Sequence, residues 1–223
     1  MQALQSSALR GTLAAVLPVG LVLSAAVVWQ STSAAFTAST DNPGNSWQSG
    51  TVALSDSDGN TIGSALFDSD RDGVLAPLQS GFRCIRVDYT GSLPAAIRFY
   101  VTTPDDGSDT LDPYLVMSVE EGLSVQEDTE VAPDCSTGFT AKTTPTSVFP
   151  TAPEDDPTLE RLRTHSGYQS GGIPVGRPDG SPVGTPTQPG THLTFKITYM
   201  LEDDNDAQGK RSDARFVWEA RNA

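Results

Sequence analysis

The sequence has few of the residues that catalytic and nucleic-acid-binding sites require. Only two histidines, His165 and His192, occur in 223 residues, and no His-Glu-x-x-His pattern of a zinc peptidase is present. Basic residues are also scarce, with 14 Lys and Arg against 28 Asp and Glu. Because nucleic-acid affinity rests on cations that neutralise phosphates, this balance argues against a nucleic-acid partner.

Charge is absent from the segment that follows Arg10. No Asp, Glu, Lys or Arg occurs between Arg10 and Asp41, and Gly11–Trp29 is almost entirely apolar. One basic residue, an apolar stretch and small residues at positions 33–35 form the pattern of an export signal. The 19 residues of Gly11–Trp29 would span about 28 Å as a helix, close to the hydrocarbon thickness of a bilayer. An uncleaved membrane anchor is therefore the alternative.

The export signal divides the chain into two parts. Cleavage between Ala35 and Phe36 would make residues 1–35 a signal peptide, or a helical anchor if uncleaved, and residues 36–223 a single domain. Signal peptidase is then an expected partner. The sequence predicts a secreted or cell-surface protein that contacts the membrane only through its N-terminal segment.

The chain has only two cysteines, Cys84 and Cys135. In an oxidising compartment an even pair is most simply a disulfide. Two free buried thiols are the alternative. A catalytic cysteine is disfavoured because no nucleophile motif surrounds either residue.

The apolar residues alternate with a period of two, which is typical of half-buried strands. Thr191–Leu201 is the clearest case, and Asp-Gly or Gly-containing turns separate the runs. The sequence therefore predicts an all-β, antiparallel two-sheet sandwich. The only helix expected after the N-terminal segment is the short Pro157–Thr164. The other expected strands are Phe36–Ala38, Thr51–Leu54, Ser64–Phe67, Phe82–Tyr89, Ala95–Val101, Tyr114–Glu120 and Arg215–Ala220.

A Pro/Gly-rich segment interrupts this pattern. Thr143–Thr191 contains nine prolines and seven glycines in 49 residues, and its apolar residues show no period. Loops of that length inside a compact domain are usually functional or disordered. We expect a largely mobile insertion at about residues 143–190, with a binding loop as the alternative.

One acidic motif is a candidate calcium site. Asp68, Asp70, Asp72 and Gly73 reproduce the first six positions of an EF-hand-type loop, but Gln79 stands where a bidentate Glu belongs. A complete EF-hand is thereby excluded. The three aspartates would form either a shorter calcium-binding turn or an acidic β-turn. Calcium is therefore the one possible cofactor that the sequence suggests.

Three aromatic residues are candidates for a carbohydrate platform, since aromatic faces stack on sugars. They are Trp47, Tyr114 and Trp218. Trp218 alternates with charged residues in an expected strand, and we therefore expect it in the core.

Ten short stretches of the sequence, taken in order, carry a family resemblance. The stretches are Val28–Ser31, Ala34–Ala38, Asn42–Trp47, Gly50–Val52, Arg83–Ile85, Val87–Ala95, Leu111–Leu115, Asp134–Phe139, Ala207–Gly209 and Phe216–Ala220. Together they resemble the TasA/camelysin-like exported proteins of Gram-positive bacteria. The resemblance covers roughly residues 28–142 and 191–223 and fails across the Pro/Gly-rich insertion.

The resemblance implies a jelly-roll-like sandwich, processing by a dedicated signal peptidase and assembly into extracellular fibres. In such fibres the N-terminal segment supplies a strand to the neighbouring subunit. Camelysin itself has been classed as a metallopeptidase. We expect an exported structural protein without a catalytic centre, with itself or other cell-surface proteins as partners. A calcium- or glycan-binding surface module and a camelysin-type metallopeptidase are the alternatives.

Overall fold

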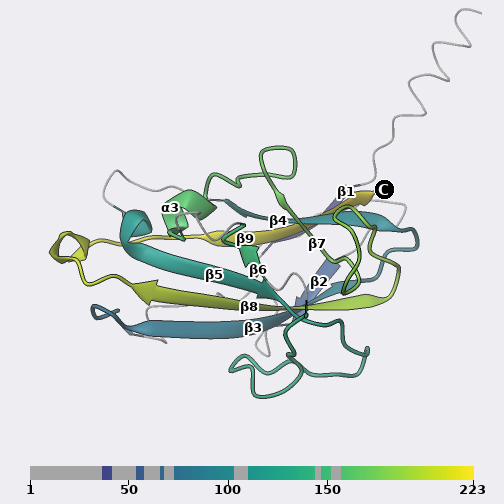
Figure 1. Cartoon of the computed structure of the whole chain (residues 1–223), viewed down its shortest axis with the longest axis horizontal. Coiled ribbons are helices and arrows are strands. Elements are labelled where there is room, and N and C mark those ends of the chain that lie inside the picture. The colour runs from purple at the N-terminus through teal and green to yellow at the C-terminus, as the bar shows by residue number, and fades with distance from the viewer. Residues whose placement is uncertain are drawn as a thin grey trace, which may run out of the picture. The chain divides into compact units, whose positions relative to one another are not determined.

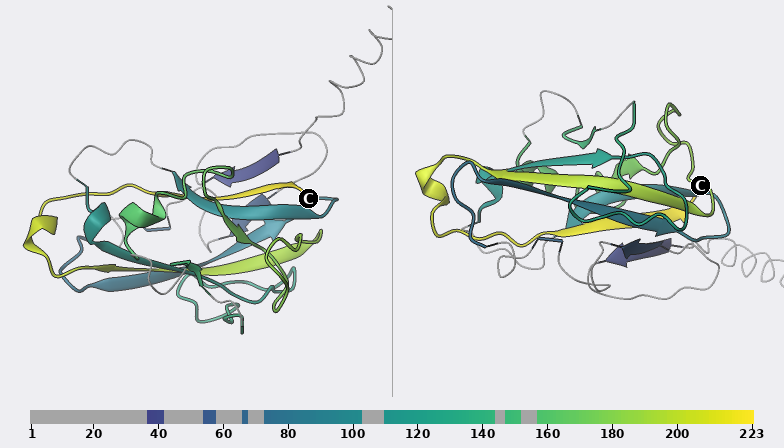
Figure 2. Two further views of the ribbon diagram at one scale, coloured as in Figure 1. Left: turned by 45° about the horizontal axis from the view of Figure 1, so that its top comes forward. Right: turned by 90° about the horizontal axis from the view of Figure 1, so that it is seen from below.

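The structure is a computed structural model, and its described part belongs to one compact unit, residues 36–223. The described residues are 37–41, 54–57, 66–67, 73–102, 110–143, 147–151 and 157–223. Among them, nine strands form two antiparallel sheets that lie as separate layers (Figures 1 and 2). The expected all-β sandwich is confirmed at this level, whereas the expected N-terminal helix lies outside the described residues.

Sheet A has four strands and sheet B has five. In sheet A the spatial order is β1 (Thr37–Asp41), β9 (Arg215–Asn222), β4 (Ala95–Thr102) and β7 (Ile173–Val175). In sheet B the order is β2 (Leu54–Ser57), β3 (Ser80–Tyr89), β8 (Thr191–Leu201), β5 (Leu115–Glu121) and β6 (Ser147–Phe149).

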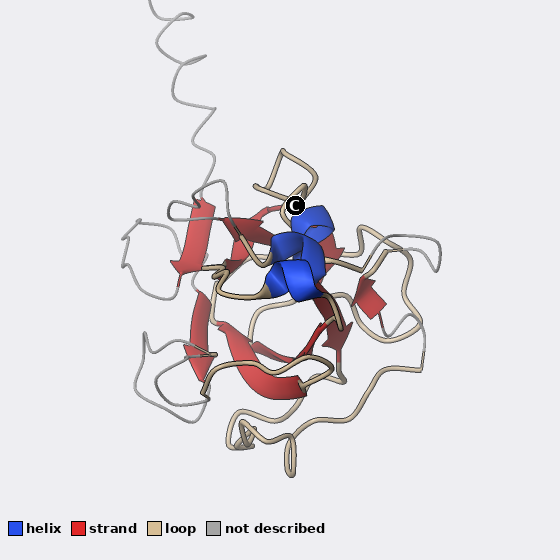
Figure 3. Ribbon diagram, turned by 90° about the vertical axis from the view of Figure 1, so that its left-hand side faces the viewer, coloured by secondary structure: helices blue, strands red, loops and turns tan. Residues whose placement is uncertain are grey.

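The short helices of the described residues gather at one end of the sandwich (Figure 3). They are η1 (Asp112–Tyr114), α3 (Leu159–Leu162) and η2 (Asn205–Ala207). A helix is therefore present within the expected range Pro157–Thr164, but it has only one turn. Thr158 caps its start, because the Thr158 side chain accepts a hydrogen bond from the Arg161 backbone N–H. Among the described residues, no helix has the length and apolarity needed to cross a membrane.

The core lies between the two sheets and follows the period-two pattern. Leu193, Phe195 and Ile197 of β8 are fully buried. The Phe195 ring lies 5.2 Å from the ring of Trp218, which belongs to the opposite sheet. Trp218 is therefore a core residue, as expected, and the long strands were predicted correctly because one face of each is buried.

Two short strands differ from expectation. β2 begins at Leu54, where the expected strand Thr51–Leu54 ends. Leu66 and Phe67 form a bend rather than the end of a strand. Both side chains nevertheless pack on the core, and the Phe67 ring contacts Tyr199 edge-on at 4.9 Å. Two apolar residues can reach the core from a bend as well as from a strand. The apolar pattern of the sequence therefore could not distinguish a bend from a strand here.

The expectation of a largely mobile insertion is wrong for its described residues. The segment contributes β6 to sheet B, β7 to sheet A and the helical turn α3. Phe149, Leu159 and Leu162 are fully buried in the core. Here glycine serves tight packing: a Cβ on Gly176 (φ +80°) would lie 2.4 Å from the Thr187 hydroxyl oxygen.

Candidate functional site: the β1 edge and the disulfide-anchored loop

A loop of residues 122–142, which we call the cover loop, lies against the outer face of sheet B (Figure 1). Backbone bonds join it to β8 at both Thr194 and His192: the Gly122 N–H donates to Thr194 at 2.8 Å and the Val125 N–H to His192 at 3.0 Å. Arg86 of β3 donates to the carbonyl oxygens of Glu127 and Thr129. These polar contacts therefore align the loop along β3 and β8.

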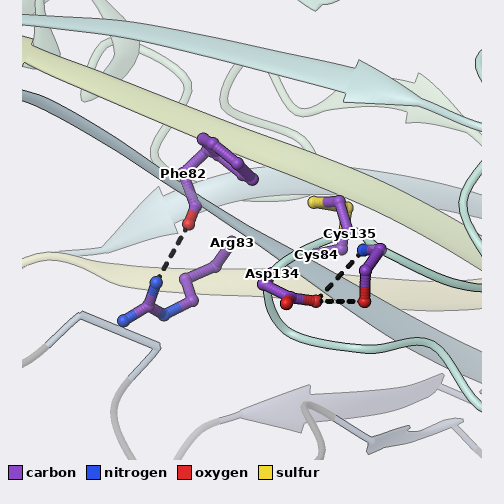
Figure 4. Close-up of a disulfide and its surroundings, with 6 residues drawn as sticks. Phe82, Arg83, Cys84, Asp134 and Cys135 are labelled. Atoms are coloured by element: carbon purple, nitrogen blue, oxygen red, sulfur yellow. Dashed lines mark hydrogen bonds between the residues drawn. A yellow bond between two sulfur atoms is a disulfide. The ribbon is translucent and has the colours of Figure 1, made fainter.

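The expected disulfide joins the cover loop to β3 (Figure 4). Cys84 and Cys135 have Cα atoms 5.2 Å apart, and the Cys84 N–H also donates to the Pro133 carbonyl at 2.9 Å. Cys135 adopts a positive φ of 57°, which is uncommon for a residue with a side chain. Hydrogen bonds from Ser136 to the neighbouring Asp134 carboxylate lower the pKa of that carboxyl group and fix the turn.

His192 pairs with Asp88 directly across the β3–β8 ladder. The His192 Nδ1 lies 2.7 Å from an Asp88 oxygen, and Arg86 donates to the other oxygen at 3.0 Å. The nearby Thr194 hydroxyl donates to the Leu123 carbonyl. These contacts tie the cover loop to the sheet. A hydrolytic triad would require a nucleophile hydrogen-bonded to the histidine, and within the described residues no hydroxyl or thiol forms a hydrogen bond with His192.

His165 occupies a different environment. Its Nδ1 lies 2.6 Å from the Gly171 carbonyl oxygen, and its ring meets Phe149 edge-on. Each histidine thus has its own partner. In the part of the chain that the structure describes, no three His, Cys, Asp or Glu side chains are grouped to hold a metal ion.

A buried ion pair escaped the sequence analysis. Lys142 and Glu121 are both almost fully buried, and the Lys142 Nζ lies 2.6 Å from a Glu121 oxygen. The same nitrogen donates to the Arg177 carbonyl, and the Gly176 N–H donates to Glu121. Burial raises the pKa of Glu121, against the influence of Lys142. The pair ties β5, the end of the cover loop and the segment after β7 together.

We expect Lys142→Met to lower the free energy of unfolding by about 3 kcal/mol, because it leaves Glu121 buried without its cation. The loss should shrink at acid pH. A carboxyl group with a raised pKa in the folded state binds a proton more readily there than in the unfolded chain, so stability rises as the pH falls toward the unfolded value near ~4.3.

Urea denaturation at pH 7 and pH 5 measures both effects of Lys142→Met. The matched control is Glu121→Gln/Lys142→Met, which removes both charges and should recover much of the stability without the pH dependence. Equal losses in the single and double variants at both pH values would contradict the interpretation.

β1 forms the edge of sheet A through backbone pairing with β9. The backbone groups of Ala95 and Val101 in β4 bond away from β9, to Thr187 and His165. Backbone groups alternate in direction along a strand, so the even-numbered residues of β4 are the ones that bond β9. The alternation of an antiparallel ladder then turns the backbone of Trp218 toward β1. Its partner Thr40 is a hydrogen-bonded position of β1.

The same alternation sorts all five residues of β1. Ala38 and Thr40 face β9, whereas Thr37, Ser39 and Asp41 direct their backbone groups away from the sheet. β1 thus has one paired edge and one outward edge.

Most of the remaining candidate residues fall outside the part of the chain that the structure describes. Asp68, Asp70 and Asp72, the cleavage pair Ala35 and Phe36, and Trp47 lie outside the described residues. Trp218 is in the core, and Tyr114 is half-buried with the Lys210 ammonium 5.5 Å from its ring. Tyr114 and Trp218 therefore do not share an exposed carbohydrate platform.

Comparisons with known proteins add no assignment: no family model, curated protein or solved structure matches this chain.

Proposed function

We propose that this chain is an exported structural protein whose copies assemble by exchanging strand β1, without a catalytic centre. The observation that carries the proposal is the position of β1, an N-terminal strand of five residues held at the edge of sheet A by β9. A strand at that position can pair with its own β9 or with the β9 of another copy through the same backbone groups.

The sequence on either side of β1 also supports an exchange of β1. The sequence after β1, Asp41-Asn42-Pro43-Gly44-Asn45, contains residues that break a strand. The signal segment before Phe36 would hold the strand at the membrane until cleavage releases it.

A cysteine pair across the β1–β9 ladder tests the exchange. Thr37 and Arg221 are direct partners at a non-hydrogen-bonded position, where Cα atoms lie about 4.5 Å apart, within the range of a disulfide. We expect Thr37→Cys/Arg221→Cys that is oxidised before assembly to stay monomeric. The same protein oxidised after assembly should give a ladder of covalently joined copies on a non-reducing gel.

The matched control is Thr37→Ser/Arg221→Ser, which loses the same side chains, including the Arg221 guanidinium 4.2 Å from the Tyr168 ring, but forms no bond. It should assemble and give no ladder. Polymers of the cysteine variant that yield only internally bonded monomers would mean that copies associate without exchanging β1.

The metallopeptidase alternative makes a different prediction. We expect the purified protein to hydrolyse casein no faster than the variant His165→Ala, with or without a chelator, because His165 bonds a backbone carbonyl and a zinc site needs about three protein ligands. The release of soluble peptides measures the rate. A chelator-sensitive rate that falls in the variant would replace the structural function with an enzymatic one.

A further inference from the structure

We infer that residues 147–151 and 157–190 cap one edge of each sheet, so that copies of this chain join only through the opposite side, which carries β1 and β2. The inference rests on the proposed function and adds the face through which a second copy docks. β1 and β2 contact each other at one side of the sandwich, and β6 and β7 contact each other at the other.

The free edge of β7 offers almost no backbone donor. Ile173 and Val175 pair with Phe99 and Ile97, whose backbone groups face β7, so Pro174 is turned outward. Proline has no N–H to donate, and prolines in sheets concentrate at such outward edge positions.

The outward-facing backbone groups on either side of Pro174, those of Gly172 and Gly176, already have hydrogen-bond partners. The Gly172 N–H donates to the Gly167 carbonyl at 2.9 Å, and the Gly176 N–H donates to the buried Glu121 carboxylate at 2.9 Å. Their carbonyl oxygens accept from Arg98 at 3.1 Å and from the Thr187 hydroxyl at 2.6 Å. An approaching strand would therefore find the N–H groups and the carbonyl oxygens of Gly172 and Gly176 already hydrogen-bonded.

Sheet B is capped on the same side by neighbouring parts of the chain. The outward Met117 N–H of β5 donates to the Pro157 carbonyl at 2.6 Å, and Val119 pairs with Phe149 of β6. The Glu121 carbonyl accepts from the Lys142 N–H. β6 itself has only three residues, and a short edge strand is a poor template for another chain.

The strands at the opposite side lack a proline block. β1 (TASTD) and β2 (LSDS) contain no proline, and each supplies the edge of a different sheet. Outward backbone groups of Thr37, Ser39 and Asp41 alternate with the groups that bond β9. The contrast predicts polymers that do not associate laterally through the edges formed by β6 and β7.

Bulky labels on the two edges test this contrast. Cys84 and Cys135 are joined, so a maleimide-linked polyethylene glycol reacts only with a newly introduced cysteine. The variants Pro174→Cys and Ser39→Cys place the label on the exposed centre of β7 and on the outward edge of β1, in protein purified from cells that express the full chain. The unlabelled variants are the controls.

We expect the label at residue 174 to leave the assembly rate within about twofold of the control. The label at residue 39 should abolish assembly because its bulk keeps a second copy away from the side that carries β1, which the loss of one outward N–H would not do. Loss of assembly with the label at 174, or assembly with the label at 39, overturns the inference while leaving self-assembly intact. Unlabelled protein that stays monomeric at high concentration overturns the proposed function and this inference together.

Hydrogen exchange gives a second measurement in the monomer. We expect the Gly172 and Gly176 amides to exchange at least about tenfold more slowly than the amides of Thr37, Ser39 and Asp41. On assembly, new protection should appear at β1, β2 and β9. New protection confined to residues 147–151 and 172–176 would place the contact between copies on the capped side and overturn the inference.

Discussion

Deletion of residues 36–45 is expected to abolish polymers and leave a folded monomer. The deletion removes β1, whereas the long strands that carry the fully buried side chains Val87, Phe99 and Phe195 remain. Without β1 no copy can fill the edge of another. Size-exclusion chromatography and negative-stain microscopy measure assembly, and the unfolding curve and the thiol titration report the fold and the disulfide.

A pair of proline variants separates strand exchange from simple contact between edges. Thr40→Pro removes an N–H that faces β9, whereas Ser39→Pro removes one that faces outward. If β1 is exchanged between copies, Thr40→Pro should prevent assembly and Ser39→Pro should permit it. The reverse result would mean that β1 pairs edge to edge with a neighbouring β1.

Neither outcome depends on the charge of the protein, since both substitutions are neutral. The formal net charge of −14 at pH 7 opposes non-specific association of monomers with an open β9 edge. Truncated protein that still forms fibres would exclude β1 as the assembling strand.

The long strands were predictable because their environment repeats every two residues. Leu193, Phe195 and Ile197 face the core. Thr194 and Lys196, which lie between them, face the other side of the sheet. The alternation of apolar and polar residues is therefore visible in the sequence. Even here the sequence missed that His192 and Thr194 are buried as well, because the cover loop that buries them is placed by contacts distant in the chain.

The short edge strand β7 was not predictable by the same reasoning. Ile173-Pro174-Val175 is too short to show a period, and its proline argues against a central strand. The proline is compatible with β7 only because the central residue faces away from β4. Local sequence therefore permits β7, but the pairing with β4 selects it.

The ion pair Lys142–Glu121 had no sequence signal. The two residues are 21 positions apart, in stretches that are typical of exposed charge, and charged residues are seldom fully buried unless paired. Their burial follows from Gly176 and Arg177, whose backbone groups complete the hydrogen bonds of both. The ion pair is assembled from three separate segments of the chain, so no single stretch of sequence could predict it.

The disulfide was predictable from the cysteine count and the expected compartment, but its position was not. Cys84 directly precedes Ile85, the first core-facing residue of β3, so its side chain points to the outer face, where the cover loop reaches it. The cover loop contributes only one fully buried apolar residue, Val131, among its described positions. Its attachment thus depends strongly on the covalent bond.

Cys84→Ser is expected to lower the free energy of unfolding by about 4 kcal/mol. The bond closes a loop of 51 residues, and in the chain-entropy model a closed loop of that size restricts the unfolded chain by roughly this amount. Urea denaturation of the exported protein under non-reducing conditions measures the loss. The control Cys84→Ala/Cys135→Ala removes the same bond without leaving a free thiol or a buried hydroxyl.

Both cysteine variants should keep the ability to assemble at 25 °C, because the cover loop lies on sheet B and β1 belongs to sheet A. The unfolding curve should move while polymer formation does not. A loss below about 1 kcal/mol would mean that polar contacts such as those from Arg86 to Glu127 and Thr129 hold the cover loop without the bond. Two free thiols titrated per chain in the unmodified protein would show that the bond does not form.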